Sequence, residues 1–162
     1  MCSLIKLILT PIICWYGMLF THKLGHIAAA LLTDATGINL HFPLLGFPQT
    51  IVQHNPHPLL EIWAGPTLGN LMPLGLLLLS IRAKRFQNFA ATFTGFCLLA
   101  NGAYIGLGGI DQIGDAGDLL RHSSPLWILI LFGITSISFG LYIWHTTLKR
   151  HRISTSTQTA TY

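Results

Sequence analysis

Charged residues are scarce in this sequence. Only 9% of the 162 residues are charged, whereas 51% are hydrophobic and the mean hydropathy is positive. An ordinary soluble domain carries about a quarter of its residues as charged side chains. This shortage excludes a water-soluble domain of this size and predicts an integral membrane protein.

Cysteine is also rare, and the sequence has no Cys-x-x-Cys pair. The three cysteines are Cys2, Cys14 and Cys97, and an odd number of unpaired positions argues against a disulfide framework. We expect Cys14 and Cys97 to act as small apolar packing residues, and we assign no role to Cys2.

The net charge of +4 does not indicate nucleic-acid binding. The basic residues lie in short clusters beside apolar runs rather than along one face, which is typical of residues that flank membrane spans. The expected partner is therefore the lipid bilayer, and no nucleic-acid partner is expected.

Four apolar segments are each close to the roughly 20 residues that cross about 30 Å of hydrocarbon. The first begins at about residue 4 or 11 and ends at 32; Thr10 and Pro11 would form a good helix start. The others are expected at about 62–81, 89–107 and 126–145. We therefore predict an all-α membrane protein with about four transmembrane helices, forming a single polytopic domain over 1–148.

The distribution of basic residues favours one orientation. Seven of them fall on one side of a four-span arrangement and only Arg121 on the other, which predicts that both termini are cytoplasmic. The acids fall on or near the opposite side; they are Asp34, Glu61, Asp111, Asp115 and Asp118.

The segment between the first two spans is too polar and too rich in proline to cross a membrane. "INLHF" at 38–42 and "TIVQH" at 50–54 alternate like short strands, and "PLLGFP" at 43–48 is typical of a turn. We predict a short β-hairpin that dips into the membrane, where it must be buried in protein or line a wet cavity. The tail, 149–162, is basic and then rich in Ser and Thr, and we predict it to be disordered.

Two histidines stand four residues apart in "THKLGH" at 21–26. On an α-helix, side chains at this spacing lie about 40° apart around the axis and about 6 Å along it, so His22 and His26 can both reach one metal ion. Alternatively, they hydrogen-bond to neighbouring helices; in either case they must face protein or a cavity. Gly25 and Ala29 form a step of small residues that lets another helix approach closely.

A zinc site needs a third ligand, and an oxygen donor commonly accompanies two histidines in hydrolases. The candidates lie in "GDAGDLL" at 114–120, which carries Asp115 and Asp118. The alternative is that these two acids cap a helix that begins near Leu119 and pair with Arg121.

Four motifs in this order resemble the site-2 protease family of intramembrane zinc metalloproteases. They are "HKLGH" at 22–26, "AGPTLGN" at 64–70, "ANG" at 100–102 and "GDAGD" at 114–118, compared with H-E-x-G-H, A-G-P-x-x-N and an Asn followed by L-D-G-G in the family. The resemblance covers about 10–120, and the hairpin has a counterpart there that is thought to present substrate.

The resemblance implies that His22, His26 and Asp115 bind Zn²⁺. It also implies that Asn70 and Asn101 support the site, as the family keeps asparagines there, and that Gly65 and Pro66 shape the second helix. The interval from Asn101 to Asp115 is longer than in the family, which leaves Asp111 as a rival ligand. The family also sets its site toward the cytoplasm, whereas the charge distribution here places the acid-rich loops outside.

The main departure is Lys23, which occupies the position of the family's catalytic glutamate. A zinc hydrolase uses that carboxylate to accept a proton from water activated by the metal, and a protonated lysine cannot do so. The leading hypothesis is a catalytically impaired homologue that binds or holds transmembrane clients. The alternatives are an active zinc endopeptidase, with Asp118, Asp111 or a neutral Lys23 as the base, and a metal-free four-helix membrane protein whose polar residues only pack helices or pass ions. A separate interpretation of Lys23 is that it pairs with Asp115 or Asp118, which makes the site a structural ion-pair cluster.

Overall fold

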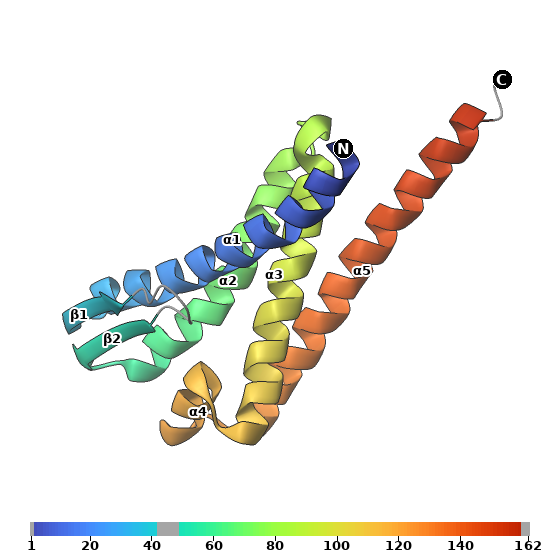
Figure 1. Cartoon of the computed structure of the whole chain (residues 1–162). Helices are drawn as coiled ribbons and strands as arrows, with labels where there is room; N and C mark the ends of the chain where they lie inside the picture. The colour runs from blue at the N-terminus through green and yellow to red at the C-terminus, as the bar shows by residue number, and fades with distance from the viewer. Residues whose placement is uncertain (1, 42–48, 160–162) are drawn as a thin grey trace.

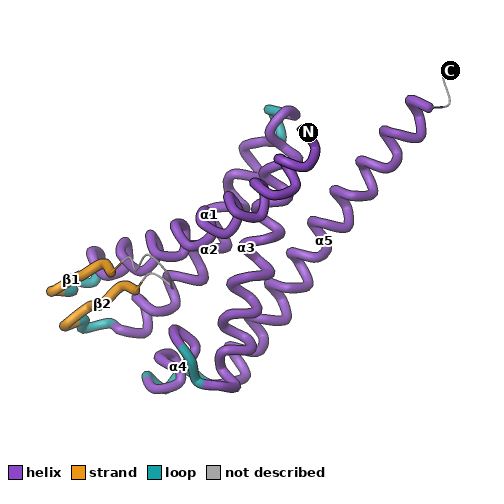
Figure 2. Tube along the Cα trace, viewed as in Figure 1, coloured by secondary structure: helices purple, strands orange, loops and turns teal. Residues whose placement is uncertain are grey.

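The computed structural model describes residues 2–41 and 49–159, which form long helices, one short helix and a small hairpin (Figures 1 and 2). In chain order, the elements are α1 (Cys2–Leu32), β1 (Thr36–His41), β2 (Gln49–His54), α2 (Pro58–Ser80), α3 (Lys84–Asp111), α4 (Gly114–Arg121) and α5 (Leu126–Thr159).

Four of these helices are long and apolar enough to cross a membrane: Leu4–Leu32, Pro58–Ser80, Phe86–Asp111 and Leu126–Lys149. Many of their large apolar side chains point outward, as lipid-facing residues do; Leu79 is 78% exposed. The predicted class is confirmed: the chain has a multi-pass helical membrane fold.

The two boundaries that the sequence predicted least well lie in α1 and α5. Of the two helix starts that the sequence left open, the one near residue 4 is confirmed by the span Leu4–Leu32. The start at residue 11 is wrong, because Pro11 lies inside α1 and Thr10 donates a hydrogen bond to the carbonyl of Lys6 at 2.7 Å instead of capping. Proline is tolerated inside membrane helices. Likewise, α5 continues to Thr159, so the structure has a helix across 149–159, where the sequence predicted a disordered tail. The helix can continue because no glycine or proline follows Gly140.

The predicted hairpin between the first two spans is confirmed. β1 and β2 pair antiparallel, with Ile38 opposite Val52 and Leu40 opposite Thr50. The turn predicted at 43–48 lies outside the described residues. The hairpin and α4 lie at one end of the bundle, and the first turn of α1 and the end of α5 lie at the other (Figure 1).

Helices pack closely in two pairs, α1 on α2 and α3 on α5. A Cβ atom at Gly25 of α1 would overlap the carbonyl oxygen of Ala64 in α2, and one at Gly133 of α5 would lie 2.8 Å from the Cα of Gly106 in α3. The close approach predicted at Gly25 is thus present, and it brings α2 against the helix that carries both histidines.

The two inner cysteines pack as predicted. Cys14 and Cys97 are free thiols, 1% and 0% exposed, in an apolar cluster with Met18 and Phe93. This cluster joins α1 to α3.

Candidate metal centre

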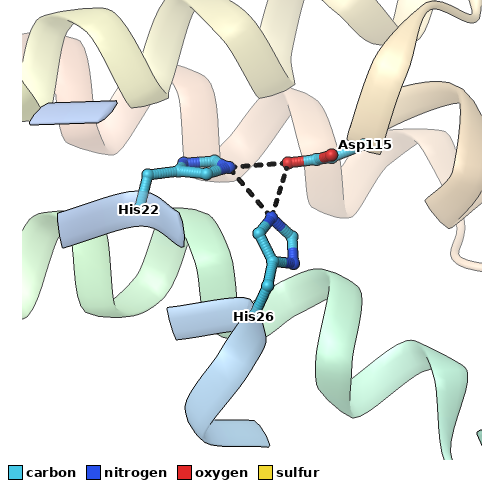
Figure 3. Close-up of side chains that lie close together, drawn as sticks. All are labelled: His22, His26 and Asp115. Carbon is cyan, nitrogen blue, oxygen red and sulfur yellow. Dashed lines mark hydrogen bonds and ion pairs between the residues drawn. The ribbon is translucent and has the colours of Figure 1, made fainter. Parts of the chain in front are cut away.

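Three side chains from two distant segments meet between the helices. The Nε2 atoms of His22 and His26 lie 3.1 Å apart, and Oδ2 of Asp115 lies 2.7 Å from the first and 3.1 Å from the second (Figure 3). His22 and His26 are 5% and 3% exposed. These are the three residues that the sequence predicted as metal ligands, and they form the one potential metal-binding group found among the described residues.

Local structure explains how each side chain reaches this point. The helical spacing puts both imidazole rings on one face of α1, with their centroids 4.9 Å apart. Asp115 lies in the first turn of α4, directly after Gly114, whose φ of +57° suits glycine. The main-chain N–H of Asp115 donates to the hydroxyl of Tyr104 in α3 at 3.1 Å.

A chain of amide hydrogen bonds determines which nitrogen of His22 carries the proton. Asn70 donates from Nδ2 to Oγ of Ser136 at 3.1 Å, and its Oδ1 accepts from Nδ2 of Asn101 at 3.2 Å. The remaining amide atom of Asn101, Oδ1, lies 2.7 Å from Nδ1 of His22 and can only accept. The proton of a neutral His22 therefore lies on Nδ1, and the Nε2 lone pair faces the centre.

His26 is held in the same tautomer by a different partner. Its Nδ1 atom lies 3.0 Å from the main-chain oxygen of Glu61 and 3.3 Å from Oε1 of the same residue. Both oxygens accept when Glu61 is ionised, so Nδ1 donates, and in the neutral ring Nε2 then keeps its lone pair. Two nitrogen lone pairs and a carboxylate oxygen then converge, an arrangement that requires a cation or a shared proton between them.

Asp115 is ionised in this setting. Without an ion, a proton on a ring Nε2 atom is donated to the Asp115 carboxylate; burial raises the pKa of Asp115, but these hydrogen bonds from His22 and His26 outweigh burial and hold that pKa well below its usual range. The carboxylate therefore supplies a full negative charge at neutral pH.

These donors fit zinc. Two imidazole nitrogens and one carboxylate oxygen are a known protein ligand set for catalytic zinc, with bonds of about 2.0 to 2.2 Å. In a tetrahedral arrangement, such bonds place ligand atoms about 3.3 Å apart. The separations of 2.7 to 3.1 Å need to widen by roughly 0.2 to 0.6 Å to accept the ion.

The other predicted residues lie in different places. Asn101 contacts His22 directly, and Asn70 stands one hydrogen bond behind it. Asp118 forms an ion pair with Arg121, which was the alternative prediction for this acid. Asp111 is an exposed residue at the end of α3 and does not belong to the cluster.

Lys23 lies beside two cavities. The larger cavity, of about 500 Å³, is bounded by β2, α2 and α4, and Lys23, His26, Glu61 and Asp115 line it. The smaller, of about 220 Å³, is mostly apolar and lies between α1 and α3. Lys23 lines both cavities and shares the larger one with the carboxylates of Asp115 and Glu61.

Two further residues belong to the site although no motif singles them out, namely Glu61 and Tyr104. Glu61 had only a weak signal, because an acid in the first turn of a helix is favoured by the helix dipole whether or not it has a function. Tyr104 had none, since aromatic residues are common in membrane helices.

Comparisons of the chain with protein-family models, with curated proteins and with solved structures give no match. The functional inference therefore depends on the residues of the site and their geometry.

Proposed function

We propose that this chain is a site-2-protease-like membrane protein that binds zinc through His22, His26 and Asp115 and is impaired in hydrolysis. The observation that carries the proposal is the convergence of two Nε2 atoms and Oδ2 of Asp115 within 2.7 to 3.1 Å, with each Nδ1 occupied by an acceptor. Such partners on the far ring nitrogen are typical of metal-binding histidines.

The impairment follows from Lys23. In this family, zinc supplies Lewis-acid activation of water and of the substrate carbonyl. This chain must then supply a group that accepts a proton, and an ammonium cannot. The nearby carboxylates are engaged elsewhere. The Glu61 carboxylate contacts Nδ1 of His26, and the Asp118 carboxylate pairs with Arg121.

The larger cavity indicates where a transmembrane client would bind. β2 lines this cavity over residues 50–54, opposite His26 and Asp115. An extended segment of a transmembrane client laid along β2 would come next to the metal ligands, and without a base it would be held and not cut. With cytoplasmic termini, as the basic residues favour, this cavity opens toward the opposite face of the membrane.

Binding without cleavage is the direct test of this function. The purified protein in lipid nanodiscs is titrated with a fluorescent peptide that spans the bilayer and unfolds near one end. We expect saturable binding that weakens when the metal is removed, and no cleavage products. Zinc-dependent cleavage lost in His26→Ala would support the active endopeptidase, with Asp118 lining the cavity as its candidate base. Absence of metal would support the metal-free alternative.

A substitution in α2 tests the role of His26 without altering any ligand. A Cβ atom at Gly65 would overlap Nε2 of the His26 ring, so Gly65→Ala must displace that ring. We expect zinc affinity to fall about 10- to 100-fold, the range for losing an orienting contact. Competition titration with a chelator measures the change.

Gly75→Ala is the matched control in the same helix, because a Cβ atom there meets nothing within 4 Å. We expect it to bind zinc like the original chain. Unchanged affinity in folded Gly65→Ala would show that the His26 ring does not bind the metal in the orientation described.

A further inference from the structure

Glu61 is a nearly buried acid in a membrane helix, and it makes two contacts to one atom. Its side chain is 12% exposed, and Oε1 lies 3.3 Å from Nδ1 of His26. Its main-chain oxygen lies 3.0 Å from the same nitrogen. An ionised group at this depth is costly unless it has partners, so these contacts point to a function.

The carboxylate faces the ring from the side away from the cluster. It lies at Nδ1, whereas the Nε2 atom of His26 faces His22 and Asp115. Glu61 is therefore not placed to accept a proton from the reacting centre. It is placed to fix the ring, as carboxylates do in carboxylate–histidine–zinc triads.

Lys23 gives Glu61 a second effect. A positive amine beside a dication weakens metal binding in a low-dielectric site unless negative charge offsets it. Lys23, Glu61 and Asp115 line the same cavity, and Asp115 is already committed to the cluster. Asp118 is less suited to this role because its side chain is 45% exposed and paired with Arg121.

We propose that Glu61 is a positioning residue of the metal centre: it holds the Nδ1 proton of His26 and offsets the charge of Lys23, which lets the site retain zinc with an amine in the position of the family's base. The proposal rests on the zinc site proposed above. It assigns Glu61 a role that the motif resemblance does not contain, because Glu61 precedes the "AGPTLGN" segment.

The test is a double-mutant cycle in zinc affinity, measured by chelator competition on the full chain at neutral pH. Glu61→Gln keeps the size of the side chain and the main-chain acceptor but removes the charge. We expect an affinity loss of about 100-fold, the upper end for such partners. In the Lys23→Gln background, where only the orienting effect remains, we expect the same change to cost about tenfold.

The control is Asp34→Asn, which removes an exposed carboxylate in the α1–β1 connection, outside the cavity. We expect unchanged affinity there, and we expect the metal-free forms of all variants to melt at similar temperatures. Zinc binding that is equal in the original chain and Glu61→Gln would overturn the role of Glu61 but leave the zinc site intact. Absence of zinc binding in the original chain would instead overturn the proposed function and this role with it.

If Glu61→Gln does not fold, zinc affinity is compared between Lys23→Gln and Lys23→Gln/Glu61→Gln. The double variant removes the charges of both Lys23 and Glu61, so it leaves no uncompensated lysine in the site. A loss of about tenfold there supports the orienting role. Equal affinity in these two variants would overturn it.

Discussion

Lys23→Glu is expected to gain zinc-dependent cleavage of a transmembrane reporter, while the original chain cleaves it slowly or not at all. The substitution places a carboxylate one residue after His22, where the family that the motifs resemble carries its base. General acid-base assistance is typically worth about 10² to 10⁴ in rate. Removing the ammonium also lowers the repulsion felt by a dication, so zinc affinity should rise together with activity.

Cleavage is measured by appearance of the two reporter fragments over time in nanodiscs. Lys23→Gln is the matched control: it removes the charge but supplies no base, so zinc should bind and cleavage should stay at the original level. Adding His26→Ala to Lys23→Glu should abolish the gain. A folded and zinc-loaded Lys23→Glu variant that remains inert would count against the assignment of the remaining ligands.

His22→Ala and Asp115→Asn are each expected to reduce zinc affinity by more than the roughly 100-fold that loss of an outer partner costs, because each removes a proposed direct ligand. Asp115→Asn is nearly isosteric and leaves the start of α4 unchanged, so the loss would reflect the missing charge and not a local rearrangement. Chelator competition and zinc content after gel filtration measure both variants.

The control for this pair is Asp111→Asn, because the spacing in the sequence left Asp111 as a rival third ligand. The structure has Asp111 exposed at the end of α3, away from the two Nε2 atoms. The Asp111→Asn variant should therefore bind zinc with the same affinity as the original chain. If Asp111→Asn loses zinc while Asp115→Asn retains it, the third ligand has been assigned to the wrong acid.

Much of the fold was predictable because its main determinants are local. Span length and apolar content predict the four membrane helices, and alternation with proline-rich flanks predicts the hairpin. Two boundaries were not predictable from the same signals. Pro11 is accepted inside α1, and the polar residues after Lys149 continue α5 as far as Thr159.

The part of the site that could be predicted consists of residues that belong to recognisable sequence motifs. The spacing of His22 and His26 and the order of the motifs led to Asp115, 89 residues beyond His26. The supporting contacts were not predictable, because they depend on how helices pack. The approach of α2 to α1 at Gly25 brings Glu61 to His26, and the packing of α5 on α3 brings Ser136 to the asparagines.

The most direct test of the central claim is the zinc content of the purified full-length chain, with Co²⁺ substitution to report the coordination geometry. The account predicts about one zinc ion per folded chain and the intense visible absorption of tetrahedral Co²⁺, both lost in His22→Ala and Asp115→Asn. A well-folded protein that holds neither zinc nor Co²⁺ after loading would contradict it. In that case, the three side chains would share a proton inside a metal-free membrane bundle.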